Sequence, residues 1–334
     1  MKKTIFTLAA VCMAMAANAT ILRVSNVNGS SAPYSTIQAA HDAASAGDTI
    51  MVDGSNTRYG LTEIRKQLVL IGPGFWINEN GLVQEAAPAA TAEFLIHAGA
   101  AGTVIEGFTF KYEMTQLLTI NADNCVVRRC YFFNHGGYVG IRFSREKVDG
   151  SYIGPDPSGA VIHQNFFADC VITTAFLNDL MTNAQITNNI FVHNEGSEWD
   201  IMNISNSYIA YNTMIGKDNN WKNFRTVHAS TIEHNIIKEE KVSYTNIHIE
   251  DNNEWSDNVV VSPTDVEVTY NSDKDIRDSN LLKNYSSNYG AFAGDSPYVL
   301  SGIPAAPVIQ DLVMPTTVEK GSKMNVTIKV GIQR

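Results

Sequence analysis

The stretch that decides the fold is residues 186–191, "ITNNIF", because its pattern returns along the chain. The pattern is an apolar residue, two variable residues, Asn, one variable residue and a large apolar residue. It recurs as "IHQNFF" at 162–167, "IAYNTM" at 209–214, "IEHNII" at 232–237 and, more loosely, "WSDNVV" at 255–260. The repeated asparagines are Asn165, Asn189, Asn212, Asn235 and Asn258, at spacings of 24, 23, 23 and 23 residues. A fixed period of this size indicates stacked repeats.

Two further columns support the same register. Upstream, "IEGFTF" at 105–110 and "VRRCYF" at 127–132 keep the apolar positions and carry Phe108 and Cys130 in place of Asn. Five residues before each of these positions stands a small residue: Thr103, Cys125, Ala160, Ala184, Ser207 and Ser230. The step from 130 to 165 is 35 residues, which we interpret as one repeat plus a polar, Gly- and Pro-rich loop at 145–159.

The period predicts coils of three short strands and three turns, stacked at about the 4.8 Å spacing of paired strands. Asn tolerates the left-handed backbone of a tight corner, and its amide can bond to the Asn of the next coil. A β-like run follows each corner, and we expect it to be the first strand of the next coil. These runs are 117–120, 140–143, 175–177, 201–204, 224–227 and 247–249. The fold class is therefore all-β.

The two ends differ from the repeats. At the N-terminus, "STIQAAHDAASAGDTIMV" predicts a helix capped by Ser35 or Thr36, ended by Gly47-Asp48 and followed by a strand at 50–52. At the C-terminus, 290–304 is rich in Gly and Pro and predicts a linker, and two strands follow around a Lys320-Gly321 turn. We expect three parts: a signal peptide at 1–19, a β-helix with its N-terminal cap at 20–289, and a linker with a strand tail at 290–334.

These features resemble the pectin-lyase-like superfamily. The opening "STIQAAHDAASAGDTIMVDG" is similar to a frequent opening of that superfamily, and the Asn column matches its internal corner between second and third strands. The resemblance covers about residues 33–262 and implies a single-stranded right-handed parallel β-helix with an N-terminal capping helix. The segment from Gly290 onward resembles a C-terminal segment of secreted bacterial proteins that carry this fold. The superfamily holds lyases, hydrolases, esterases and proteins without known activity, so it does not fix a function.

Composition limits the location and the partners. Lys2 and Lys3, a short apolar run and Ala17-Asn18-Ala19 predict a cleaved signal peptide and an exported protein. Removal of the two lysines takes the formal charge from −10 to −12, which argues against nucleic acid and anionic lipid as partners. No later segment is long and apolar enough for membrane insertion. Cys125, Cys130 and Cys170 are expected to be buried free thiols.

The candidate site lies on the outward face of the first strands. Strict alternation places three basic residues outward, and we take them with a nearby carboxylate as catalytic candidates: Arg142, Asp200, Arg225 and His248. Trp199, Asp200, Glu198 and Trp221 are expected in the loops that lead to these strands, with both tryptophans exposed. Trp199, Trp221 and Glu198 are the candidate substrate-binding residues, the tryptophans through sugar stacking.

The motifs that would settle a reaction are missing. The paired Asp, Gly-His-Gly and Arg-x-Lys motifs of pectin hydrolases are absent, and the histidines do not form a column. The acidic residues of 250–278 lack an EF-hand spacing, so we interpret them as a solvated face rather than a calcium site. No metal or cofactor is predicted, and Ca2+ is the weaker alternative.

Three hypotheses remain. The first is a secreted polysaccharide lyase or glycoside hydrolase that works on the first-strand face. The second is a non-catalytic glycan-binding protein or surface scaffold. The third adds a protein partner that docks on the C-terminal strands.

Overall fold

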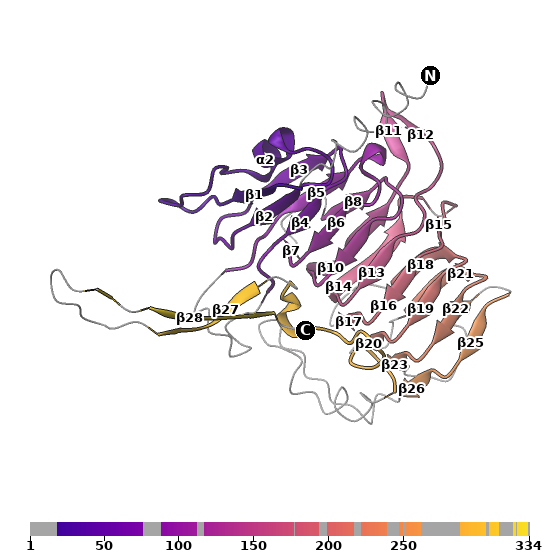
Figure 1. Cartoon of the computed structure of the whole chain (residues 1–334). Coiled ribbons are helices and arrows are strands. Elements are labelled where there is room, and N and C mark those ends of the chain that lie inside the picture. The colour runs from indigo at the N-terminus through magenta and orange to yellow at the C-terminus, as the bar shows by residue number, and fades with distance from the viewer. Residues whose placement is uncertain are drawn as a thin grey trace, which may run out of the picture.

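The computed structural model shows a long stack of parallel strands with a short helix packed at the N-terminal end of the stack (Figure 1). It describes residues 19–75, 88–111, 117–176, 178–193, 199–216, 222–238, 247–249, 252–261, 288–304, 307–313, 323–324 and 326–332. Residues 1–18, where the signal peptide was predicted, lie outside this part of the chain.

One parallel sheet of ten strands runs the length of the stack and contains the second strand of each coil. Its strands, in spatial order, are β1 (Ile21–Val24), β2 (Thr49–Val52), β4 (Val69–Ile71), β6 (Val104–Glu106), β9 (Val126–Arg128), β13 (Val161–His163), β16 (Gln185–Thr187), β19 (Tyr208–Ala210), β22 (Thr231–Glu233) and β25 (Glu254–Ser256). The spatial order equals the chain order, as a β-helix requires.

The other large sheet contains both the third strands and the first strands of the coils. They belong to one sheet because two of its strands each continue through a corner, from the third strand of one coil into the first strand of the next. The third strands are β7 (Thr109–Lys111), the first halves of β10 (Tyr131–Phe143) and β14 (Phe166–Thr174), β17 (Ile190–His193), β20 (Thr213–Gly216), β23 (Ile236–Lys238) and β26 (Val259–Val261). The first strands are β3 (Leu61–Ile64), β5 (Glu93–Ile96), β8 (Leu118–Ile120), the second halves of β10 and β14, β18 (Trp199–Ser205), β21 (Lys222–His228) and β24 (Ile247–Ile249). The short β15 (Met181–Thr182) pairs with β18.

The predicted parallel β-helix is thus confirmed, and one first strand is placed differently from the prediction. We expected a strand at 175–177, but β14 ends at Thr174 and residues 175–176 form a bend. The reason is that β14 turns at Asp169 without a loop and continues directly as the first strand.

The asparagine ladder forms as predicted. Each ladder Asn after Asn165 accepts, through Oδ1, from the backbone N–H and the side-chain amide of the ladder Asn before it, at 2.8–3.0 Å. At the N-terminal end, Asn165 Oδ1 accepts from the N–H of Cys130, which occupies the ladder position of its coil. Asn165, Asn189, Asn212 and Asn235 are fully buried, so each of these bonds is made away from water.

The left-handed corner residue is not the ladder Asn, contrary to the prediction. In each coil the residue just before the ladder position has the positive φ. These residues are Gly107, Arg129, Gln164, Asn188, Tyr211, His234 and Asp257. The ladder Asn was predicted to serve the turn, but its inward amide serves the hydrogen bonds between coils instead.

The column of small residues also forms a partial ladder. Ser207 Oγ accepts from the N–H of Ala184 at 2.9 Å, and Ser230 Oγ accepts from the N–H of Ser207 at 3.0 Å. Asn253 Oδ1 continues the series by accepting from the N–H of Ser230 at 2.8 Å. Small buried residues at this corner allow the hydroxyl groups to reach the neighbouring coil.

Inside the coils, aromatic rings follow the strand spacing. Phe110, Phe132, Phe167 and Phe191 stack with ring centroids 4.6, 4.8 and 4.7 Å apart. These distances match the separation of paired strands, so the stack continues from coil to coil without strain. The last apolar position of the sequence repeat therefore builds the core.

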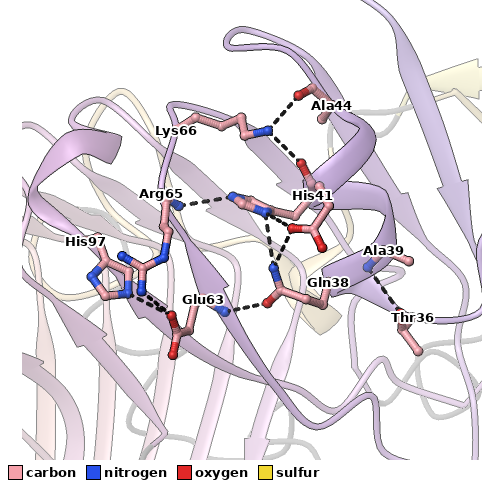
Figure 2. A network of polar contacts seen from close by, with 10 residues as sticks. Thr36, Gln38, Ala39, His41, Ala44, Glu63, Arg65, Lys66 and His97 are labelled. Atoms are coloured by element: carbon pink, nitrogen blue, oxygen red, sulfur yellow. Dashed lines mark hydrogen bonds and ion pairs between the residues drawn. The ribbon is translucent and has the colours of Figure 1, made fainter.

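The predicted N-terminal helix caps the first coils. Helix α2 (Ile37–Ala43) is capped by Thr36, whose side chain accepts from the N–H of Ala39, and it packs on β1, β2 and β3. Figure 2 shows how polar groups attach it to the first corner. The buried His41 accepts from the N–H of Arg65 at 3.1 Å, and Lys66 Nζ donates to the carbonyls of His41 and Ala44. Gln38 Oε1 accepts from the N–H of Glu63 at 2.9 Å.

The predicted loop at 145–159 contains an antiparallel hairpin. Strands β11 (Glu146–Val148) and β12 (Ser151–Ile153) are joined by Asp149 and Gly150, both with positive φ. Two consecutive left-handed residues make the tight turn that Asp-Gly favours in hairpins. Asp149-Gly150 was therefore the signal in the sequence that the loop interpretation overlooked.

The segment predicted as a linker packs against the coils. Residues 288–304, which we call the strap, run back along the third-strand side from the coil of His234 toward that of Phe75. The strap includes the short 3-10 turn η6 (Leu300–Gly302), and a second turn of this type, η2 (Ala98–Ala100), follows β5. Asn188 donates to the carbonyls of Ala291 and Ala293 at 3.0 and 2.8 Å. The segment packs against the coils and is not a free linker, because the outward residues of the third strands are apolar and are buried beneath it.

The strap and the outer sides of the third strands form a second apolar cluster, separate from the main core. It joins the outer sides of the third strands to the strap, and its buried members are Phe75, Tyr131, Phe166, Ala168, Ile190, Val192, Ile215, Ile236, Ala291 and Tyr298. Beyond the strap, β27 (Pro307–Val313) and β28 (Thr327–Ile332) form the predicted antiparallel pair. The pair projects from the side of the stack in Figure 1, and the predicted Lys320-Gly321 turn lies outside the described residues.

Candidate functional site

The candidate site is the outward face of the first strands, which we call the first-strand face. Strand register aligns one outward column across neighbouring coils: Glu63, Leu95, Thr119, Arg142 and Thr173, and then, in the later coils, Met202, Arg225 and His248. The residues on either side of this column, such as Ile141 and Phe143, are buried in the core. The outer side of the third strands is covered by the strap. On the first-strand column Arg142 is exposed, Glu63, Leu95, Met202 and Arg225 are partly exposed, and Thr119 and Thr173 are buried.

The three basic candidates share this column, as alternation predicted. Arg142 is exposed, and Arg225 is partly exposed. Arg225 pairs in register with His248 on the adjacent strand. The side chain of His248 is not among those that the structure describes. The strands of Thr173 and Met202 separate Arg142 from Arg225, which puts the two arginines about 14 Å apart at the usual strand spacing. The three residues are therefore aligned but do not form one compact cluster.

Trp199 and Asp200 are placed differently from the prediction. Both are the first residues of β18 rather than loop residues, and they are 7% and 0% exposed. The indole of Trp199 carries the guanidinium of Arg225 over its ring, with Cζ 5.6 Å from the centroid. Asp200 Oδ2 accepts from Asn223 Nδ2 at 2.7 Å. A buried indole cannot offer an exposed stacking face; Trp199 instead supports Arg225. Glu198 and Trp221 lie outside the described residues.

The structure also assembles a polar cluster that the sequence did not reveal. His97, just after β5, lies between two carboxylates: Nδ1 is 2.8 Å from Glu146 Oε1, and Nε2 is 3.4 Å from Glu63 Oε2. Figure 2 shows Glu63 with His97 and with Arg65, which also pairs with this carboxylate. The imidazole is only 12% exposed. No sequence signal points to this cluster, because Glu146 follows His97 by 49 residues and sits at the start of the inserted hairpin.

The carboxylates of this cluster are held in the ionised state. The guanidinium of Arg65 lowers the pKa of Glu63 below its usual value. Burial opposes the ionisation of Glu146, but hydrogen bonds from the N–H of Ala98 and from His97 outweigh it, so the pKa of Glu146 is lowered as well. Nδ1 faces Glu146, and the buried Nε2 faces Glu63, so the imidazole links the two carboxylates.

A second charged group stands beside the inserted hairpin. Arg145 lies 3.4 Å from Asp156 and 3.2 Å from Asp179. Burial, together with the neighbouring Asp156, raises the pKa of Asp179 above its usual value. Because one guanidinium serves two carboxylates, this group fixes the base of the insertion.

Other chemistries find little support in the described part of the chain. Cys125, Cys130 and Cys170 are buried free thiols, as predicted, and burial raises the pKa of Cys125 and Cys130 to about 12, which keeps these thiols protonated. Within the described ranges, no group of three or more His, Cys, Asp or Glu side chains is arranged to hold a metal ion. Of the acidic run at 250–278, the structure describes only Asp257 among the predicted solvated aspartates, and it is exposed. No described helix is long and apolar enough to cross a membrane.

Comparison with known proteins adds no assignment. No protein-family model matches the chain, and no curated protein sequence matches it.

Proposed function

We propose that this chain is an exported, polysaccharide-interacting β-helix protein of the pectin-lyase-like type, and that it binds acidic glycans along the first-strand face. The observation that carries the proposal is the alignment of Arg142 and Arg225 on one outward column of parallel strands. A linear polyanion laid across the strands would meet these cations in succession. The protein as a whole is acidic, at −10, so a local basic column is what such a ligand requires.

The second support is the fixed position of Arg225. Its guanidinium lies over the ring of Trp199, and the neighbouring Asp200 is engaged by Asn223. Among the described residues no carboxylate pairs with Arg225, so its charge can meet an external carboxylate or sulfate, while the aromatic ring limits its rotamers. A pre-positioned guanidinium gives up less conformational entropy when it binds a ligand.

The test is binding of the full chain to a panel of polyuronates and sulfated glycans, measured by affinity electrophoresis and calorimetry. Arg142→Gln and Arg225→Gln should each weaken binding about tenfold, and added salt should weaken wild-type binding. Arg23→Gln is the control, because Arg23 is a half-exposed cation in β1 that pairs with Asp53 away from the column. Equal affinity of all three variants and the wild type would contradict the proposal.

A polysaccharide lyase or glycoside hydrolase activity is the second candidate, and the position of His97 between Glu146 and Glu63 favours it. A histidine oriented by a carboxylate is a suitable general base or acid. Incubation with the same glycans should then yield unsaturated uronate or new reducing ends, and His97→Gln should remove the product. Binding without product across the panel would favour the alternative, a non-catalytic glycan-binding scaffold.

A protein partner for the C-terminal strands is a separate proposal. Met324, Val326 and Ile328 are exposed, and within the described residues β27 and β28 pair only with each other. Two-stranded hairpins are marginally stable alone, so an added strand would stabilise this one. Deletion of 305–334 should leave the coils folded and abolish association with the partner, as measured by sedimentation.

A further inference from the structure

The inserted hairpin and the residues after β14 present an exposed apolar group that the coils do not use. Val148, Tyr152, Ile153 and Phe176 are 46%, 38%, 50% and 41% exposed. Several corners of this kind are closed by short turns, as at 65–68 between β3 and β4 and at 206–207 between β18 and β19. The insertion therefore adds exposed rings to the molecule without adding to its core.

The rings of this group are held in a defined geometry. Tyr152 and Phe176 meet edge to face with centroids 4.8 Å apart, and Lys147 Nζ lies 5.6 Å from the Tyr152 centroid. The hairpin is closed at its tip by the Asp149-Gly150 turn. At its base, Glu146 accepts from the N–H of Ala98 and pairs with His97, both at 2.8 Å. A short hairpin anchored in this way loses little entropy when a ligand packs on it.

The aromatic pair stands at the rim of the first-strand face. Phe143 and Thr174 are register partners at the ends of β10 and β14. The hairpin begins three residues after Phe143, and Phe176 is two residues after Thr174. Arg142 and Thr173, the preceding register pair, lie on the first-strand face itself. A chain that contacts Arg142 and continues along the strand direction would reach the two rings next.

The chemistry of this place favours a sugar over a lipid or an extended protein interface. The apolar group is small, and the carboxylates near it have cationic or imidazole partners: Glu146 pairs with His97, and Asp156 and Asp179 pair with Arg145. Arg142, an exposed cation, lies one position before the end of β10, from which the hairpin follows, and a uronic-acid sugar offers both apolar C–H faces and a charged edge. Aromatic rings beside polar groups suit such a ligand.

We infer that Tyr152 and Phe176 form a sugar-stacking subsite at the rim of the first-strand face, for a uronic-acid polysaccharide whose carboxylate pairs with Arg142. The inference rests on the proposed function and assigns a specific part of that surface. Stacking on the rings would orient the chain across β10 and β14, with the inserted hairpin as one wall.

The test measures the affinity of the full chain for polygalacturonate, alginate and hyaluronate by calorimetry. Tyr152→Ala and Phe176→Ala should each weaken binding about tenfold. Tyr152→Phe, which keeps the ring, and Val148→Ala, which changes an exposed aliphatic residue of the same hairpin, should stay within about twofold of the wild type. All three substituted positions are exposed, so thermal midpoints should be nearly unchanged and a loss of affinity would report the contact itself.

The outcomes separate this subsite from the proposed function. If the Arg142 and Arg225 variants lose affinity while the ring variants keep it, the subsite is wrong and the glycan-binding face stands. If only the ring variants lose affinity, stacking on the rings stands, but the pairing of the carboxylate with Arg142 and the basic column are wrong. Absence of wild-type binding to every glycan overturns both. Binding to phosphatidylcholine vesicles that depends on Tyr152 and Phe176 would overturn the assignment to a sugar.

Discussion

The side-chain amide of Asn189 donates to Oδ1 of Asn212 at 3.0 Å, although the two residues are 23 positions apart in the chain. The same oxygen accepts from the N–H of Asn189, also at 3.0 Å. One buried oxygen thus satisfies two donors of the preceding coil. This relationship repeats along the stack and couples each coil to the next.

Asn212→Ala should destabilise the protein by about 3 kcal/mol or more, because it leaves two buried donors of Asn189 without an acceptor. It also removes the amide that donates to the carbonyl of Ile186 at 2.8 Å. Asn258→Ala, at the partly exposed end of the described ladder, should cost clearly less because water replaces the lost bonds. Chemical unfolding monitored by circular dichroism measures both. Equal losses for the two variants would contradict the cooperative ladder.

Thr226→Asn should stabilise the protein by about 1 kcal/mol, because Thr226 has a left-handed backbone with φ 55. The corresponding residue of the preceding coil is Asn203, with φ 60, which shows the residue type that suits this position. Asn203→Thr should cost a similar amount and also lose the bond to Thr174 Oγ1 at 2.9 Å. Thermal midpoints of both variants test the pair, and a lower midpoint for Thr226→Asn would refute the strain argument.

Acidification should weaken the attachment of the strap through His163. Burial lowers the pKa of His163 from 6.5 to about 4, while its ring contacts Thr187 Oγ1 at 2.8 Å and Ser296 Oγ of the strap at 3.1 Å. The unfolded chain therefore binds the proton more readily than the folded one. The stability contribution is complete above pH 6.5 and is lost as the pH falls toward 4, by about 1–2 kcal/mol near pH 5.

The measurement compares the thermal midpoints of the wild type and His163→Gln between pH 7 and 4.5. The wild type should lose more stability than the variant over this range, since only the wild type has this titrating group. Parallel profiles would show that His163 does not contribute to the pH dependence.

Gly302→Ala should release the far end of the strap. A Cβ at this position would lie 2.3 Å from the carbonyl oxygen of Arg129 and 2.5 Å from a ring carbon of Phe75. We expect a loss of about 3 kcal/mol and faster proteolysis within 288–304. Gly154→Ala is the matched control, because Gly154 also has a positive φ but nothing within 4 Å, so it should cost about 1 kcal/mol. Similar behaviour of the two variants would mean that the clash is relieved without moving the strap.

Much of the fold was predictable from residues that repeat. The ladder asparagines, the stacked phenylalanines and the outward column of Arg142 and Arg225 all follow from one period, because in-register coils place residues one repeat apart side by side. The capping helix was predictable from its local signals, and Thr36 caps it as expected.

Of the candidate site, the sequence predicted only the alignment of its basic residues on one outward column. Trp199 was expected on the surface and is buried under the guanidinium of Arg225, because residues at a loop–strand boundary have no periodic signal for orientation. The hairpin at 146–153 breaks the repeat, and its contacts with His97 and Phe176 depend on how the insertion folds back.

The sequence by itself determined the coil, its period, its internal amide ladder and its N-terminal cap, since these depend on local signals and on a constant repeat. Only the tertiary structure decided which residues meet outside that repeat. The pairing of His97 with Glu146, the burial of Trp199 and the path of the strap over the third strands each join segments of unrelated spacing. Such contacts are selected by packing of the whole chain, because no local or periodic preference specifies them.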